Sequence, residues 1–141
     1  MKWVVDTCVI IDILAGDVVF ARPSALACDA KREAGLIIAP ITYIELAPSF
    51  NGNIGDQNAF LDELGVICDF GCGKDIVLTA HRAWYEHILR KRRGATPKRP
   101  VADIVIGAMA MRHAGLITRN ESDFRTLYPD LQIFNPATAF A

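Results

Sequence analysis

Four acidic residues stand at places in the sequence where an apolar run ends or where a helix is expected to begin. They are Asp6, Glu45, Asp103 and Asp123. Three of these positions are strand-to-helix junctions of the kind found in α/β folds, in which functional groups collect at the carboxyl ends of parallel strands. A cluster of carboxylates repels itself unless it binds a cation. Since Mg²⁺ and Mn²⁺ prefer oxygen ligands, the sequence predicts a site for one of these ions.

Each of the four acids also has a purely structural interpretation. Asp6 follows the apolar run 3–5 and can cap the next helix, and Asp103 opens an apolar helix whose dipole favours a negative charge there. Glu45 can lie on the polar face of an amphipathic helix, and Asp123 can cap a surface turn. The metal-site interpretation depends on all four meeting at one sheet edge. Uncharged polar residues are available to orient the ligands, namely Thr7, Thr118 and Asn120.

Segment 90–99 carries six of the fifteen positive charges of the chain. The remainder has nine positive against 16 negative charges, although the whole chain has a net charge of only −1. A basic stripe on an acidic body favours docking of an anion such as nucleic acid, whereas the plainer interpretation is a solvated helix end. Because the same chain carries the predicted metal-binding carboxylates, we interpret the stripe as a binding surface for RNA phosphates. Its expected contacts are Arg90, Arg92, Arg93, Lys98 and Arg99.

A length of 141 residues suits one domain with a sizeable core. Hydrophobic residues make up 52% of the chain, and the mean hydropathy of +0.24 is high for a small monomer. The apolar stretch 104–111 is far too short to span a bilayer, and Asp6 and Asp12 interrupt the apolar amino terminus, so we expect neither a membrane segment nor a signal peptide. The excess apolar residues instead predict an oligomer interface or a groove for a partner.

The four cysteines do not have the spacing of a zinc site. Only Cys68 and Cys72 are close in sequence, no second pair follows, and the three histidines lie at unsuitable intervals. We interpret all four as free thiols in the reducing environment of the cytoplasm.

Short apolar runs alternate with helical patterns along the chain. Strands are expected at 3–5, 36–39, 66–69, 116–118 and 131–134. Helices are expected at 7–15, 18–34, 41–47, 56–64, 75–93, 101–113 and 120–127, with a loop at 94–100. This alternation with short links predicts an α/β fold in which a central parallel sheet of four to five strands is covered on both faces.

Four motifs together resemble those of a known family: 5–12 (VDTCVIID), 42–45 (TYIE), 103–108 (DIVIGA) and 118–124 (TRNESDF). In order, spacing and total length the chain is similar to a PIN domain, and within that family to a VapC-type toxin of a toxin–antitoxin pair. The resemblance covers essentially the whole chain. It implies a single PIN domain over 1–141 with a three-layer α/β/α sandwich.

The resemblance also implies an activity, because similar proteins are metal-dependent ribonucleases whose four acidic residues hold Mg²⁺ or Mn²⁺. By that resemblance Asp6, Glu45, Asp103 and Asp123 are the metal-binding and catalytic set of an endoribonuclease. Asn120 stands where many relatives carry Asp, which leaves one-metal and two-metal chemistry both open. Asp12 recurs in the opening motif of relatives and is interpreted as a structural helix residue. Two other readings stay open: a metal-dependent DNA nuclease or phosphatase, and a catalytically silent binding module.

Resemblance to VapC-type toxins implies a protein partner as well. That partner is an antitoxin with a DNA-binding amino-terminal part and a flexible carboxyl-terminal segment. We expect this segment to lie along a groove beside the helices in 7–34 and 42–50. The chain itself is expected to form a symmetric homodimer, the commonest closed assembly.

Overall fold

Five short strands form one parallel sheet at the centre of the computed structural model, which describes residues 1–91 and 100–141. Their order across the sheet is β3-β2-β1-β4-β5. The strands are β1 (Trp3–Val5), β2 (Leu36–Ile38), β3 (Val66–Cys68), β4 (Gly115–Ile117) and β5 (Ile133–Phe134). Such β-branched and apolar runs are typical of strands that are buried on both faces.

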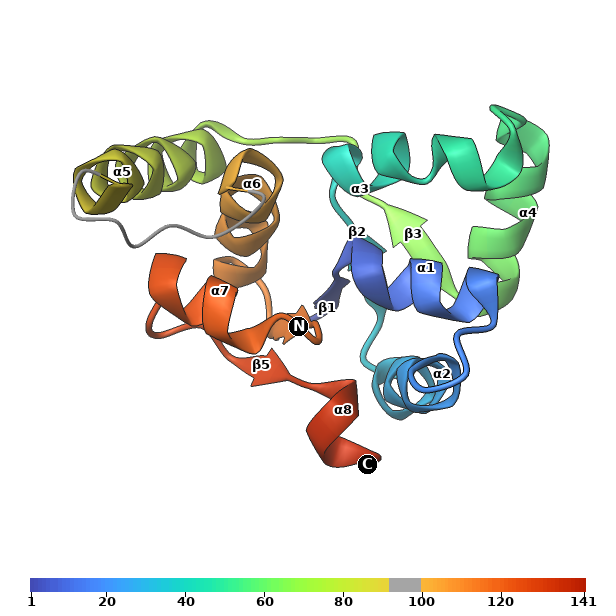
Figure 1. Cartoon of the computed structure of the whole chain (residues 1–141). Coiled ribbons are helices and arrows are strands. Elements are labelled where there is room, and N and C mark those ends of the chain that lie inside the picture. The colour runs from blue at the N-terminus through green and yellow to red at the C-terminus, as the bar shows by residue number, and fades with distance from the viewer. Residues whose placement is uncertain (92–99) are drawn as a thin grey trace.

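Helices cover both faces of this sheet, so that the molecule has three layers. Figure 1 shows α5, α6 and α7 on one side of the strands and α1, α2 and α4 on the other. The helices are α1 (Thr7–Ala15), α2 (Ala21–Lys31), α3 (Pro40–Glu45), the 3₁₀-helix η1 (Ala47–Phe50), α4 (Ile54–Leu64), α5 (Lys74–Lys91), α6 (Pro100–Met111), α7 (Glu121–Leu127) and α8 (Pro136–Ala139).

Alternation along the strands creates a separate apolar core on each side of the sheet. Val4 and Leu116 point into the core beneath α5, α6 and α7, where Met109 and Phe124 are fully buried. Their neighbours along the strands point into the opposite core, beneath α1, α2 and α4; these include Val5, Ile38 and Ile117. Because successive strand residues face opposite sides, a shift of one residue in register would exchange the two cores.

The central strand β1 pairs with β2 on one side and with β4 on the other. After β1 the chain builds the sheet outward through β2 and β3, and it then returns through α5 and α6 to place β4 against the opposite edge of β1. The strand order therefore reverses between β1 and β4. In open parallel sheets, ligands bind in the crevice beyond the carboxyl ends of the strands at such a point.

Glycine permits a close contact on the side that carries α6. A Cβ atom at Gly107 would lie 2.4 Å from Cε2 of Tyr128, so only glycine lets the Tyr128 ring pack this closely against the helix. The ring is held there by its hydroxyl, which donates a hydrogen bond of 2.6 Å to the carbonyl oxygen of Ile104. Burial raises the pKa of this hydroxyl.

The structure confirms the predicted α/β fold with its five-stranded parallel sheet, while several element boundaries differ. The helix expected at 18–34 is α2 and begins at Ala21, because the Asp17 carboxylate accepts hydrogen bonds from the backbone N–H groups of Val19 and Phe20 and holds a turn there. The short helices η1 and α8 were not predicted. The expected loop 94–100 falls largely outside the described residues. No helix in the ranges 1–91 and 100–141 is long and apolar enough to cross a membrane.

Candidate functional site

Asp6 and Thr118 lie side by side at the point where the strand order reverses. The register pairs Val5 with Ile117, and the Asp6 backbone N–H donates to the Ile117 carbonyl oxygen at 3.0 Å. The residue after each strand therefore reaches the same edge of the sheet. There the Thr118 hydroxyl donates a hydrogen bond of 2.8 Å to Asp6 Oδ2. This contact joins residues that are 112 positions apart in the sequence.

The Asp6 carboxylate is 1% exposed, and both of its oxygens accept hydrogen bonds. Oδ1 accepts from the Thr7 backbone N–H at 2.8 Å, which makes Asp6 the N-cap of α1. Oδ2 accepts from the Thr118 hydroxyl. The capping interpretation is thus correct, and it does not exclude a role in binding, because donors that favour the ionised form keep a buried carboxylate charged.

Glu45 is joined to Thr7, the residue that follows Asp6, by a hydrogen bond from the Thr7 hydroxyl. The Thr7 hydroxyl lies 2.8 Å from Glu45 Oε1 and 2.9 Å from Thr42 Oγ1. A carboxylate only accepts hydrogen bonds, so the Thr7 hydroxyl donates to Glu45 Oε1, and it also lies within donating distance of the Thr42 hydroxyl oxygen. Thr42 is fully buried and was not among the predicted supporting residues. Its position one turn before Glu45 on α3 was the available signal.

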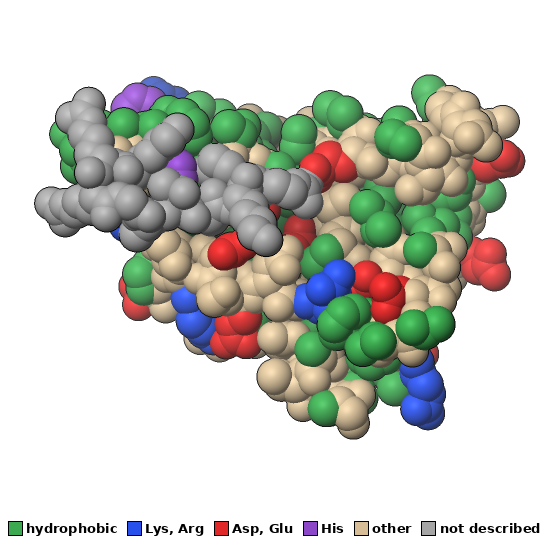
Figure 2. All heavy atoms as spheres, in the orientation of Figure 1, with side chains coloured by type: hydrophobic (Ala, Val, Ile, Leu, Met, Phe, Trp, Pro, Cys, Tyr) green, Lys and Arg blue, Asp and Glu red, His purple; other side chains and the backbone are tan. Residues whose placement is uncertain are grey.

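Asp103 and Asp123 lie in the first turns of α6 and α7. Asp103 is 3% exposed, and α6 packs against α3, α5, α7, β1 and β4. Shared binding of one ion by the four acids stays a prediction. In the described part of the chain, no three His, Cys, Asp or Glu side chains lie close enough together to hold a metal. Figure 2 shows acidic side chains, in red, near the middle of the face of the molecule that it displays.

Comparisons with known proteins identify the fold. No family model matches the chain, and no curated protein matches it. Solved structures do match, among them two VapBC structures. A chain of VapBC-1 from nontypeable Haemophilus influenzae aligns with a TM-score of 0.68 at 23% identity, over 96% of this chain and 98% of that one. The second structure is VapBC2 from Rickettsia felis bound to a promoter DNA fragment. A chain of it aligns with a TM-score of 0.64 at 16% identity, with the same coverage. The chain has a PIN-like fold. The predicted resemblance to VapC-type PIN proteins is confirmed for the fold.

The Cys8 thiol lies beside Asp6 and Thr118 at the ends of β1 and β4, which we call the strand-end site. Cys8 Sγ donates to Asp6 Oδ2 at 3.3 Å and lies 3.9 Å from Thr118 Oγ1. Burial, together with the negative charge of Asp6, raises the pKa of the Cys8 thiol to about 12. The thiol therefore stays protonated at neutral pH and donates a hydrogen bond to Asp6.

A partly buried ion pair fixes the loop that carries Thr118 and Asn120. The Arg119 guanidinium donates to the Asp12 carboxylate at 2.6 Å through Nε and at 3.0 Å through Nη2. Asp12 also accepts from the Ser24 hydroxyl at 3.3 Å, and Arg119 lies 4.1 Å from the centre of the Phe20 ring. The hydrogen bond to Asp12 raises the pKa of Arg119.

This ion pair clamps the loop after β4 against α1 and α2. Asp12 is structural, as predicted, but its partner Arg119 was not identified from the sequence. The available signal was the position of Arg119 between two of the predicted site residues. Within the loop, the Asn120 backbone N–H donates to Thr118 Oγ1 at 3.0 Å.

Most of the predicted basic stripe, namely Arg92, Arg93, Lys98 and Arg99, lies outside the described residues. Arg90, near the end of α5, is described and is half-buried. Its Nε and Nη2 atoms are shielded from solvent and have no hydrogen-bond partner in the described part of the chain. Contact of this residue with a nucleic acid stays a prediction.

Proposed function

We propose that this chain is the toxin component of a toxin–antitoxin pair and acts as a metal-dependent endoribonuclease. The observation that carries the proposal is the Thr118–Asp6 hydrogen bond at the strand-order reversal, with Glu45 held by Thr7 beside it. The PIN-like fold, shared with chains of two VapBC structures, supports the toxin assignment. In this proposal Asp6, Glu45, Asp103 and Asp123 form the catalytic set.

The donor chemistry of these residues fits Mg²⁺ or Mn²⁺. The groups available are carboxylates, which suit hard cations. The four acids would hold the ion. When bound, it would supply Lewis-acid stabilisation of negative charge at the phosphorus centre and an activated water at neutral pH.

The chain's own residues keep the acids in place. The hydroxyls of Thr118 and Thr7 each donate to one carboxylate, so they orient Asp6 and Glu45 and favour their ionised forms. No Ser, Cys or His is needed as a nucleophile.

The substrate and the protein partner also belong to this proposal. RNA is expected to lie along segment 90–99, where positive side chains neutralise phosphates in a manner that carries little sequence information. The antitoxin is expected to cover the groove beside 7–34 and 42–50 and to restrain the enzyme in the cytoplasm.

Substitution of Asp103 by Asn tests the catalytic set, because it removes one buried negative charge at nearly constant volume. In Mg²⁺ or Mn²⁺ we expect RNA cleavage by Asp103→Asn to fall by about 10²-fold or more, as with the loss of a major electrostatic group. Asp62→Asn on the exposed side of α4 is the matched control and should cleave at the wild-type rate.

Two outcomes would overturn different parts of the proposal. Equal cleavage of RNA by Asp103→Asn and wild type would remove the site assignment. Cleavage of DNA but not RNA by the same preparation would replace the substrate. Growth after induced expression, with and without the antitoxin gene, tests the toxin assignment separately.

A further inference from the structure

Strand β3 forms one border of the sheet, and its outer edge has no neighbouring strand in the described part of the chain. The other border is β5, and the two borders differ in how well they are covered. Ile133 and Phe134 of β5 are both half-buried. By contrast, Ile67 of β3 is 62% exposed, and Phe70, two residues after the strand, is 69% exposed. The open and apolar border is therefore β3.

The backbone of β3 presents hydrogen-bonding groups at this open edge. Alternate residues of a strand turn their N–H and C=O groups to opposite sides within the sheet. The Asp69 N–H donates to the carbonyl oxygen of Ile38 in β2 at 3.1 Å, so the groups of Ile67 also face β2. Those of Val66 and Cys68 face outward, where a further strand could bond to them.

A groove of about 280 Å³ follows the same edge, and all three residues of β3 line it. Its other walls come from α4 and from two aromatic residues, Tyr43 and Phe70. The centres of these two rings lie 5.4 Å apart. Because the groove extends along the whole strand, it fits an extended chain better than a compact ligand.

The two sides of the sheet give this border different surroundings. Ile67 pairs in register with Ile37, which belongs to the core beneath α5, α6 and α7. Ile67 itself is exposed, because β3 packs chiefly against β2 and α4. On the opposite side, α4 buries Leu61 and leaves Asp62 exposed. One side of the border is thus apolar, and the other side is acidic.

The charges around the groove are negative. Asp62 and Glu63 are exposed on α4, and Asp69 directly follows β3. No Lys, Arg or His is among the described residues that line the groove. Sheet edges are often protected from pairing by Lys or Pro, and β3 has neither. The short length of β3 limits non-specific pairing, while its acidic surroundings favour a basic strand.

We propose that an extended segment of the antitoxin adds a strand to the outer edge of β3. Tyr43 joins this groove to the surface beside 42–50, where the antitoxin segment is expected to lie. The backbone of the segment bonds to the outward groups of β3, as in other cases of strand addition. Side chains alternate along a strand, so apolar residues of the segment cover Ile67 and its Lys or Arg residues lie near Asp62. The inference takes its partner from the proposed toxin assignment and adds the surface and the conformation of binding.

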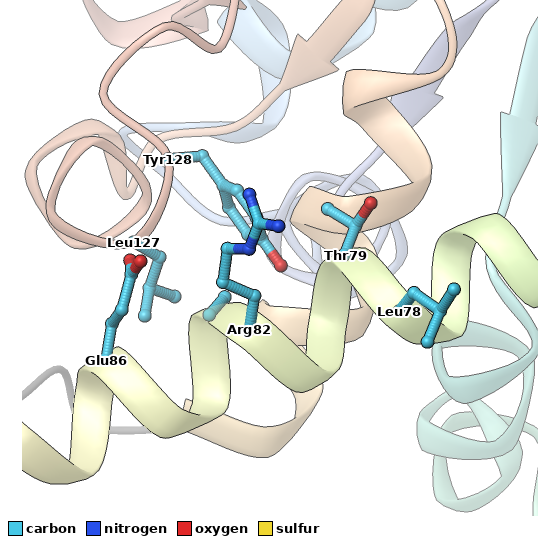
Figure 3. A pocket seen from close by; sticks show the side chains of 7 residues that line it. Leu78, Thr79, Arg82, Glu86, Leu127 and Tyr128 are labelled. Atoms are coloured by element: carbon cyan, nitrogen blue, oxygen red, sulfur yellow. The ribbon is translucent and has the colours of Figure 1, made fainter.

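The outer face of α5 provides a contrasting surface. It carries Leu78, Arg82 and Glu86, all of them exposed. Figure 3 shows the two charged side chains leaving the same side of α5, beside a cavity of about 250 Å³ that Leu127 and Tyr128 also line. A helix bonds its own backbone groups along its length, so this cavity offers no strand edge to a partner. Glu86 therefore serves as the control position.

Amide hydrogen exchange tests the pairing on the complex of the full-length chain with its antitoxin. Exchange at Val66 and Cys68 should slow by at least about tenfold relative to the free chain, because their N–H groups become hydrogen-bonded. The N–H of Ile67 already faces β2, so its exchange should change less. NMR spectra of the isotope-labelled chain follow the three amides separately.

Substitutions at Cys68 isolate the backbone contact. Cys68→Pro removes an outward N–H and spares the bonds to β2, as proline does on edge strands, whereas Cys68→Val keeps the N–H. In calorimetric titration with the antitoxin, Cys68→Pro should have a dissociation constant at least about tenfold above that of Cys68→Val. Asp62→Lys, which lies outside the sheet, should weaken binding by a similar factor through like-charge repulsion. Glu86→Gln should leave the constant unchanged.

Three results would overturn the pairing. The first is a complex in which Val66 and Cys68 exchange as they do in the free chain, which would leave the toxin assignment intact. The second is an equal dissociation constant for wild type, Cys68→Pro and Asp62→Lys. The third is the absence of any complex, which would overturn the toxin assignment as well. Circular dichroism spectra verify that each variant is folded, and if Cys68→Pro is not, exchange and Asp62→Lys decide.

Discussion

The strand-end site and the outer face of α5 treat charged groups in opposite ways. At the ends of β1 and β4, each oxygen of the buried Asp6 carboxylate meets donors from the chain itself. Along α5, Arg82 and Glu86 are exposed and form no ion pair within the described residues. The first arrangement is completed by folding, whereas the second has no ion-pair partner in the described part of the chain. The difference teaches that donors from the same chain preorganise the strand-end site, while the charges on α5 stay in contact with solvent.

The largest effect on stability is expected at the clamp behind the strand-end site. Arg119→Met keeps an apolar stem but leaves the Asp12 carboxylate, with a side-chain exposure of 6%, without its cation. We expect a loss of about 3 kcal/mol in the free energy of unfolding, as for a buried pair that loses one partner. Urea denaturation measures this loss.

The exposed pair Arg112–Asp75, in which the side chains are 58% and 51% exposed, provides the control. Arg112→Met is expected to cost less than about 1 kcal/mol, because solvent already screens that pair. Equal losses in the two variants would show that the loop after β4 is not clamped by a desolvated ion pair.

A smaller effect on stability, joined to an effect on activity, is expected at Thr118. Thr118→Val keeps the shape of the side chain but removes the donor to Asp6 and the acceptor for the Asn120 N–H. The cost is expected to be about 1–2 kcal/mol, with a fall in kcat for RNA that Thr118→Ser restores. Thr126→Val, which loses only an exposed contact with the Ser122 carbonyl oxygen, should change neither. A loss of stability without any change in kcat would make Thr118 structural only.

The smallest effect near neutral pH is expected from the buried thiols. Burial raises the pKa of Cys8 and Cys28 to about 12, from an ordinary value of 9.0. The unfolded chain therefore loses these protons at lower pH than the folded chain does. Their contribution to stability is complete below pH 9 and is lost as the pH rises toward 12.

Thermal unfolding between pH 8 and pH 11 measures this slope. Cys28→Ala is expected to flatten the alkaline loss, whereas the exposed Cys72, replaced by Ala, should leave it unchanged. An unaltered slope in Cys28→Ala would mean that another group titrates in this range.

Much of the fold was predictable because it depends on local patterns. The apolar runs that end at Asp6 and Thr118 define β1 and β4, and alternation of strands with helices predicts a parallel sheet. These two strands become neighbours when the sheet forms, because β4 pairs with the free edge of β1. The beginning of α2 was harder, because the carboxylate of Asp17 caps a turn over residues that have helical apolar spacing.

Tertiary contacts explain what the sequence could not supply. Arg119 pairs with Asp12 across 107 residues, and no local pattern connects two such positions. Thr42 is likewise a buried hydroxyl whose role appears only when α1 and α3 meet at Thr7. The positions of Asp103 and Asp123 on their helices were predicted, whereas their convergence on one cation stays a prediction.

The pairing of β1 with β4 has a consequence for the synthesis of the protein on the ribosome. The Asp6 side of the contact leaves the ribosome 112 residues before the Thr118 side, which takes roughly ten seconds at common rates of translation. Throughout that interval the nascent chain contains Asp6 and lacks Thr118, so the strand-end site is incomplete. Ribosome-stalled chains that end before Gly115 are expected to cut no RNA, and release of chains extended through β5 should start cleavage. In the proposed toxin–antitoxin pair, the antitoxin would have a short period, set by translation, in which to bind the early helices before the proposed site is complete.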